Sequence, residues 1–86
     1  MPMTREEANA ALETALSEVA PEVDLGAVNR TGPLQEELDL DSMDFLNLVA
    51  AILVHTGLDI PDRDYPLLGT VDSCLDYLVA QGDTVP

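Results

Sequence analysis

A single serine lies inside an acidic segment near the middle of the chain. Between Leu34 and Phe45 it is surrounded by acids, namely Glu36, Glu37, Asp39, Asp41 and Asp44. We expect Ser42 to be exposed at a loop-to-helix junction. No neighbouring side chain is a base, so its hydroxyl is a poor nucleophile by itself. The residue types alone favour a helix N-cap, and spacing and charge do not distinguish a cap from an attachment site.

The other residues that carry chemistry are one histidine and one cysteine. His55 lies on a narrow polar stripe of a predicted helix, whereas Cys74 lies on the apolar face of another. A Cys–His pair needs both groups to converge on a third, orienting group, and nothing in the pattern predicts this. We expect Cys74 to be a buried core residue and His55 to interact with free carbonyls at a helix end.

No metal site is expected. One His and one Cys exclude the usual zinc ligand sets, and the acids are not spaced as in a calcium loop.

Four helical segments must position these residues. Thr4 and Glu7 fit a capping box for a first helix that ends at Pro21. A long connection over residues 22–41 follows, and Asp41 or Ser42 is expected to cap a second helix that runs to Thr56 and stops at Gly57. A short third helical turn starts near Ile60. A last helix, capped by Thr70, is expected to reach about Ala80.

No stretch alternates as a strand does, so the sequence predicts an all-α fold, a small four-helix bundle with three main helices, one short helix and a long loop between helices 1 and 2. We expect residues 1–86 to form a single domain.

The charge is strongly asymmetric. Asp and Glu total 17 against three Arg and no Lys, and the formal net charge is −14. Such a chain has no basic patch for nucleic acid or an anionic membrane, and should be steered toward basic protein surfaces. The N-terminal segment is acidic rather than apolar, and the longest apolar run, 48–54, is too short to span a membrane. We therefore expect a cytoplasmic protein, and a monomer.

A family resemblance adds to this interpretation. The motif Asp41-Ser42-Met43-Asp44 resembles the Asp-Ser-Leu motif of acyl carrier proteins. Its surroundings fit too, because positions 34–80 align with the family without a gap. The matching segments are Glu37-Leu38, Leu48-Val49, Ile60-Pro61-Asp62, Thr70-Val71 and Leu75-Asp76-Tyr77-Leu78. The first helix matches in type.

The resemblance implies a function that the serine alone does not. In this family a phosphopantetheinyl transferase moves 4′-phosphopantetheine from coenzyme A onto the motif serine, here Ser42. The preceding aspartate, here Asp41, helps to position that magnesium-dependent reaction. The thiol of the arm then carries an acyl group as a thioester, and the carrier performs no chemistry itself. The resemblance thus implies a free-standing carrier, not an enzyme, for fatty acid, polyketide or related secondary metabolism.

The chain departs from the family at several positions. Asp39 replaces a usual Gly, and Asp tolerates a left-handed conformation better than most residues. Asn47, Leu53 and Val54 replace acids of relatives in fatty-acid synthesis. We therefore hypothesise that partner enzymes with basic and apolar docking surfaces bind here more by apolar contact than by salt bridges; Leu53 alternatively belongs to the core. The candidate docking residues are Met43, Asp44, Leu46, Asn47, Ala50 and Val54.

Tyr65-Pro66 is a further departure. The resemblance implies that the short third helix helps to form a cargo groove, with Ile60, Tyr65 and Leu68 as candidate groove residues. Tyr65 is expected to narrow this groove, which favours a short, polar or otherwise unusual cargo. Alternatively, Tyr65 only covers the core with its hydroxyl in water.

Two other functions remain open at this point. One is a carrier of aminoacyl, D-alanyl or peptidyl groups, since Asp-Ser-Met is tolerated there too. The other is an acidic helical interaction module with an unmodified Ser42.

Overall fold

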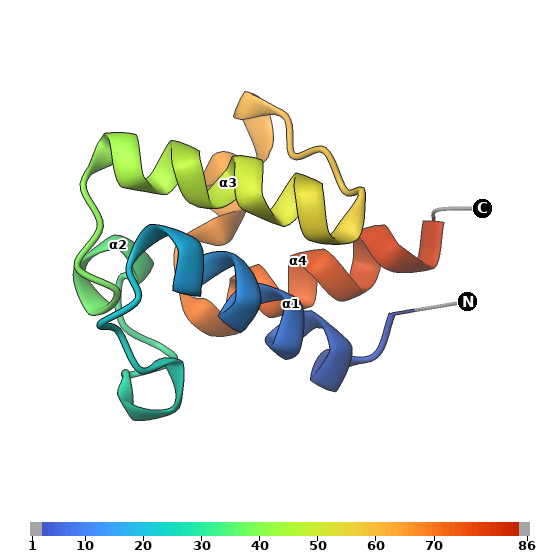
Figure 1. The fold of residues 1–86 in the computed structure, drawn as a ribbon. Coiled ribbons are helices and arrows are strands. Elements are labelled where there is room, and N and C mark those ends of the chain that lie inside the picture. The colour runs from blue at the N-terminus through green and yellow to red at the C-terminus, as the bar shows by residue number, and fades with distance from the viewer. Residues whose placement is uncertain (1–2, 85–86) are drawn as a thin grey trace.

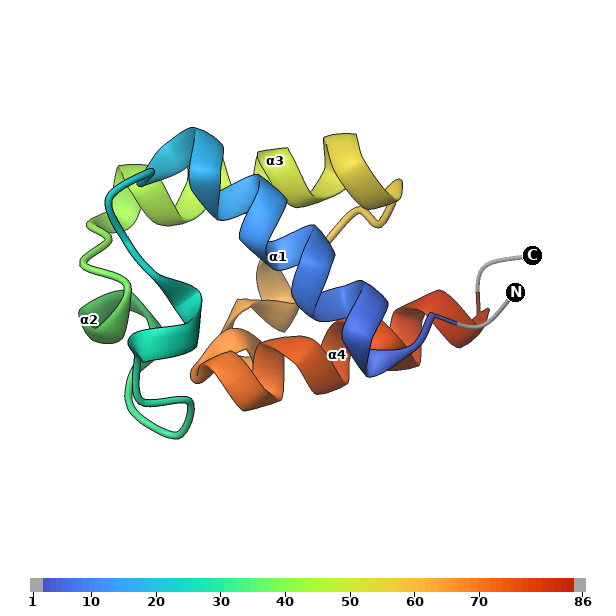
Figure 2. The ribbon, with the colours of Figure 1, turned by 60° about the horizontal axis from the view of Figure 1, so that its bottom comes forward.

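The computed structural model describes residues 3–84, which fold as a helical bundle without strands in that range. In chain order the elements are α1 (Arg5–Val19), η1 (Leu25–Ala27), α2 (Leu34–Glu37), α3 (Ser42–Thr56), η2 (Asp62–Leu68) and α4 (Val71–Thr84), where η marks a 3₁₀ helix. The predicted all-α fold with three long helices is confirmed. Figure 1 shows α1 below α3 and in front of α4, and Figure 2 shows it running obliquely from α3 to α4.

The first helix begins where its sequence predicts. The Thr4 hydroxyl accepts a hydrogen bond from the Glu7 amide at 3.1 Å, and the Glu7 carboxylate accepts one from the Thr4 amide at 3.1 Å. This reciprocal pair is the expected capping box. One face of α1 is buried, with Ala8, Leu12, Ala15 and Leu16. That face packs on both α3 and α4, so α1 holds the other two long helices together.

The connection between α1 and α3 is more structured than the expected loop. It contains η1 and α2, and the side chains of Leu25, Leu34 and Leu38 are buried in the core. Two backbone hydrogen bonds join it to the distant segment before and at the start of α4: the Leu34 amide donates to the Gly69 carbonyl (2.8 Å) and the Asp72 amide to the Arg30 carbonyl (3.1 Å). These bonds fix α2 beside the end of η2.

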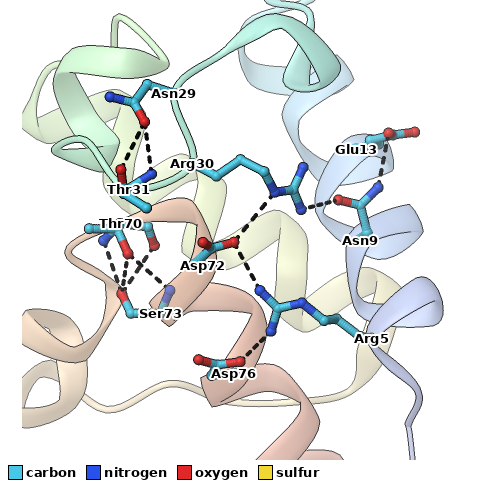
Figure 3. A network of polar contacts seen from close by, with 10 residues as sticks. All are labelled: Arg5, Asn9, Glu13, Asn29, Arg30, Thr31, Thr70, Asp72, Ser73 and Asp76. Atoms are coloured by element: carbon cyan, nitrogen blue, oxygen red, sulfur yellow. Dashed lines mark hydrogen bonds and ion pairs between the residues drawn. The ribbon is translucent and has the colours of Figure 1, made fainter.

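An ion-pair cluster, the arginine clamp, reinforces this junction (Figure 3). It comprises Arg5, Asn9, Arg30, Asp72 and Asp76. The Asp72 carboxylate contacts Arg5 (2.9 Å) and Arg30 (3.4 Å), and Arg30 also donates to the Asn9 amide oxygen (3.0 Å). Arg5 pairs with Asp76 as well. The clamp therefore joins α1, the connection and α4.

The last helix is capped as expected but is longer than expected. The Thr70 hydroxyl accepts from the Ser73 amide, and the Thr70 amide donates to the Ser73 hydroxyl, both at 3.0 Å. The prediction that α4 ends near Ala80 was wrong, because the helix continues through Gly82 to Thr84. Gly82 is buried against Met3, and a Cβ at position 82 would lie 2.6 Å from the Met3 Cβ. Here glycine allows a close approach and does not end the helix.

The central helix α3 ends as its sequence predicts. Gly57 has φ 76°, and its amide donates to the Leu53 carbonyl at 2.8 Å, as in a left-handed C-terminal cap. The inner face of α3 carries Phe45, Leu48, Val49 and Ile52 into the core. The short helix η2 begins at Asp62 and ends at Leu68, two residues after Pro66. Its packing is mainly against α4. Within residues 3–84, no helix combines the length and apolar character needed to cross a membrane.

Candidate functional site

Ser42 is the first residue of α3, and the N-cap is its neighbour. The Asp41 carboxylate accepts a hydrogen bond from the Asp44 amide at 2.8 Å, with Asp41 in the extended conformation of an N-cap. From the sequence, Asp41 and Ser42 were equally suitable N-caps of this helix. The structure shows that Asp41 is the N-cap. Ser42 is exposed, and no hydrogen bond involves its hydroxyl in the described part of the chain. The side chain is thus not required for the helix end.

The turn before Ser42 depends on Asp39. This residue has φ 54°, and within residues 3–84 it is the one residue other than glycine with a positive φ. The left-handed conformation expected of Asp39 is therefore confirmed. The Leu40 amide then donates to the Gln35 carbonyl at 2.8 Å, which places Leu40 in the core and presents Asp41 and Ser42 at the surface.

The acids around Ser42 differ in their local roles. Glu37 accepts a hydrogen bond from the Asn29 amide at 2.8 Å and so belongs to the connection. Asp44 lies in the first turn of α3, where the helix dipole favours a carboxylate. Glu36 and Asp39 are exposed and contribute negative potential beside the serine. A basic partner surface is attracted to this end of the molecule.

A cavity of about 470 Å³ opens beside Ser42. Its walls come from α2, the start of α3, η2 and the residue after η2; they comprise Pro33, Leu34, Gln35, Ser42, Phe45, Leu46, Tyr65, Pro66, Leu68 and Gly69. Ligand pockets in proteins are generally of this size. Two of the predicted groove residues, Tyr65 and Leu68, lie here. The sequence pattern did not predict that α2 lines this cavity. A backbone hydrogen bond from the Leu34 amide to the Gly69 carbonyl holds α2 there.

A second cavity, of about 530 Å³, lies further along α3. It is lined by Leu46, Val49, Ala50, Leu53, Asp59, Ile60, Pro61, Asp62 and Tyr65. The third predicted groove residue, Ile60, therefore belongs to this cavity and not to the one beside Ser42. Leu46 and Tyr65 line both cavities.

One aromatic contact and one hydrogen bond fix the geometry between α3, η2 and α4. The Tyr65 ring meets the Phe45 ring edge to face, with centroids 5.4 Å apart and an interplanar angle of 82°. Next to it in the chain, Asp64 accepts a hydrogen bond from the Tyr77 hydroxyl of α4 at 2.7 Å. Burial of Tyr77, together with this bond, raises the pKa of Tyr77 to about 12. Partial burial and the Asp62 carboxylate likewise raise the pKa of Tyr65 above its usual value.

The outer face of α3 is apolar and exposed. Met43 is 68% exposed, Leu46 47%, Leu53 41% and Val54 77%. We call these four residues and the exposed Ala50 the apolar strip. Leu53 is therefore a surface residue and not part of the buried core, although it lines the second cavity. Among the other candidate docking residues, Asn47 is exposed and Asp44 is half-buried. The strip begins one residue after Ser42.

His55 and Cys74 lie apart from this site. His55 contacts the Glu18 carboxylate of α1, so the prediction that it binds free carbonyls was wrong. Along the axis of α3, Ser42 and His55 are separated by about 20 Å, so His55 is no base for Ser42. Cys74 is buried as predicted, and burial raises the pKa of its thiol to about 12. The thiol therefore stays protonated near neutral pH. Among the described residues, no group of three or more His, Cys, Asp or Glu could hold a metal ion.

Comparison with known proteins identifies the family. A family model described as "Phosphopantetheine attachment site" matches residues 10–78, which is most of the chain. The chain is 32% identical over 56 residues to the mitochondrial acyl carrier protein of Neurospora crassa, covering 65% of this chain and 42% of that protein. It is 32% identical over 57 residues to the acyl carrier protein of Rubrobacter xylanophilus, covering 66% of this chain and 70% of that protein.

A helical bundle that matches a phosphopantetheine attachment model defines the class. The chain belongs to the acyl carrier protein family. Proteins of this class are carriers and not enzymes, and their prosthetic group is a covalently attached phosphopantetheine. The chain matches less than half the length of the Neurospora protein.

Proposed function

We propose that this protein carries acyl groups as thioesters on a 4′-phosphopantetheine arm attached to Ser42, and presents them to enzymes of fatty acid, polyketide or related secondary metabolism. The main support is that two neighbouring residues at one helix end have different roles. Asp41 caps α3, while the exposed Ser42 lines a cavity and is free for attachment. We further propose that residues 1–86 form one carrier domain, monomeric and cytoplasmic.

The residues around Ser42 suit a covalent attachment made by another enzyme. A bound arm supplies the thiol that bears the cargo. Within residues 3–84, Ser42 has no basic neighbour to take its proton, because the only histidine is paired with Glu18 at the far end of α3. The proton must therefore be removed by a phosphopantetheinyl transferase. Asp41 precedes Ser42 in the chain, and its hydrogen bond from the Asp44 amide fixes its carboxylate. We propose that Asp41 helps to position the magnesium-dependent transfer.

The apolar strip is proposed as the docking surface for the transferase and for the enzymes that use the cargo. It begins beside Ser42 and lies on a rigid helix, so a partner bound there has its active site near the arm. The chain carries a formal net charge of −14, which favours a partner surface with basic groups around an apolar centre. Met43, Leu46, Ala50 and Val54 would contribute apolar contact, and Asp44 and Asn47 polar contact.

Two rival functions make different predictions. An exposed apolar strip also suits an interaction module in which Ser42 stays unmodified. A carrier of aminoacyl, D-alanyl or peptidyl groups requires the same arm but a different loading enzyme. The state of Ser42 separates the first rival from the proposal, and the accepted cargo separates the second.

The test is the intact mass after incubation with coenzyme A and a broad-specificity phosphopantetheinyl transferase. We expect the wild type to gain the mass of one phosphopantetheine group and Ser42→Ala to gain nothing. Ser17→Ala is the matched control, because Ser17 is exposed on α1 and lines neither of the two cavities along α3. It should be modified as the wild type is. A wild type that gains no mass would overturn the proposal in favour of the interaction module.

A further inference from the structure

Two cavities lie one after the other between α3 and η2. The cavity beside Ser42 measures about 470 Å³ and the more distant one about 530 Å³. Leu46 of α3 and Tyr65 of η2 are the two residues that line both. They face the space from opposite sides, since one belongs to each helix. Leu46 and Tyr65 therefore lie where the cavity beside Ser42 meets the cavity that contains Ile60.

The position of Tyr65 is fixed on two sides. Its ring contacts the Phe45 ring edge to face, which joins it to the inner face of α3. Its neighbour Asp64 is hydrogen-bonded to the Tyr77 hydroxyl at 2.7 Å, which joins η2 to α4. Displacing the ring therefore requires loss of an aromatic contact or movement of η2 away from α4. A buried aromatic contact of this kind adds to the free energy of area burial.

We propose that Tyr65 and Leu46 form a partition that limits the cargo to short acyl groups. This inference rests on the proposed attachment at Ser42. A short acyl group can be sheltered on the Ser42 side of the partition. A long acyl chain cannot lie along the groove, because the partition separates the two apolar walls on which successive methylenes would be buried. The long chain stays in water, and its thioester remains open to attack.

The test measures how well the protein protects thioesters of two lengths. Wild type, Tyr65→Ala and Leu67→Ala are loaded with butanoyl or dodecanoyl groups from the acyl-coenzyme A compounds and then treated with hydroxylamine. Leu67 is the control because it lies on the same helix, is 54% exposed and lines neither cavity. Tyr65→Ala also removes the ring contact with Phe45, so Leu46→Ala serves as a second variant that opens the same partition from α3.

The expected result is a change specific to the long chain. In the wild type, dodecanoyl thioester should be cleaved within about twofold of the same thioester on free pantetheine. Tyr65→Ala should slow this cleavage about tenfold, and Leu46→Ala should slow it in the same direction, whereas Leu67→Ala should match the wild type. Butanoyl thioester should react alike in all four proteins. A wild type that already protects dodecanoyl thioester as well as Tyr65→Ala does would overturn the partition.

A second measurement separates this inference from the proposed function. In Ser42→Cys, the new thiol can be alkylated with short or long N-alkyl iodoacetamides, without a transferase. Cys74 is spared because it is buried and its thiol stays protonated at neutral pH. The short alkyl group should raise Tm, and lengthening it should raise Tm further only when Tyr65→Ala is added. Equal gains from the long group with and without Tyr65 would contradict the partition, whereas failure of the transferase on wild type would contradict only the attachment.

Discussion

Two regions of this molecule use opposite chemistry. The arginine clamp joins α1, the connection and α4 through charged side chains at the surface, including two of the three Lys and Arg residues of the chain. The region around α3 and η2 has exposed apolar side chains, and among the described residues two interhelical side-chain hydrogen bonds join it to its neighbours, Tyr77–Asp64 and His55–Glu18. The third cation, Arg63, is exposed on η2.

The difference indicates how the sequence separates stability from binding. In a chain of net charge −14, the few cations near the connection offset repulsion among acids and hold a long segment in place. Beyond its first turn, α3 carries no Asp, Glu, Lys or Arg. Apolar contact between this part of α3 and a partner therefore desolvates none of these charged side chains. Variants in the clamp should therefore change stability and leave transfer unchanged, and variants in the strip should do the reverse.

The largest effect is expected for charges placed in the apolar strip. Val54→Glu and Met43→Glu should each lower kcat/KM of a partner enzyme that uses the loaded carrier by about tenfold or more, because a carboxylate would be desolvated at the interface. Both residues are more than two-thirds exposed and line neither cavity, so the unfolding free energy should stay within about 0.5 kcal/mol. Leu67→Glu on η2 is the control. Unchanged transfer in both folded variants would exclude the strip as a docking surface.

A smaller effect is expected in the clamp. Asp72→Asn keeps the side-chain shape but removes the charge that Arg5 and Arg30 share, so unfolding by urea should show a loss of about 1 kcal/mol. The loss should shrink in about 1 M salt, where exposed charges are screened. Phosphopantetheine loading should be as fast as in the wild type. A loading defect in a fully folded Asp72→Asn would mean that the two regions are not separate.

Loss of the Tyr77–Asp64 hydrogen bond should lower the unfolding free energy by a similar amount, and this loss should depend on pH. Tyr77→Phe should lower stability by about 1 kcal/mol near neutral pH. Because folding raises the pKa of Tyr77 from 10.0 to about 12, the neutral phenol stabilises the fold fully below pH 10. The difference in unfolding free energy between the wild type and Tyr77→Phe should therefore fall as the pH rises from 10 to about 12. Urea titrations of wild type and Phe variant across that window measure it, and parallel curves would show that the bond contributes nothing.

The smallest effect concerns the end of α3. Ser42→Ala should change the unfolding free energy by less than about 0.5 kcal/mol. Its neighbour Asp41→Ala should cost about 1 kcal/mol, as much as the two preceding variants, because it removes the N-cap. Thermal unfolding of the two variants gives the comparison directly. If Ser42→Ala were the more destabilising variant, the serine would have a structural role that the geometry does not give it.

Local signals made much of the fold predictable. Thr4 with Glu7, and Gly57, act through neighbours in the chain, so residue type and spacing were enough to place them. The left-handed turn at Asp39 was expected from the family resemblance, in which this position is usually Gly. The end of α4 was not predicted: the helix continues through Gly82, which allows the distant Met3 to approach α4. The arginine clamp was not predicted either, since its partners come from three segments with no shared periodicity.

The site was predictable to a similar degree. Ser42 could be singled out, but Asp and Ser are equally good caps, and only the folded geometry assigns that role to Asp41. Tyr65 was expected to narrow the groove, and the structure adds its counterpart on α3, Leu46. No sequence pattern pairs these two residues, because their proximity follows from how η2 packs on α4.

Attachment of phosphopantetheine to Ser42 can be tested by locating the added group in the chain. Trypsin cleaves after Arg30 and Arg63, and the resulting peptide 31–63 contains Ser42 as its only serine. After treatment with coenzyme A and the transferase, we predict that this peptide gains the mass of one phosphopantetheine group, with the fragment ions assigning it to Ser42. A peptide 31–63 of unchanged mass, or a modification on any other residue, would contradict the account.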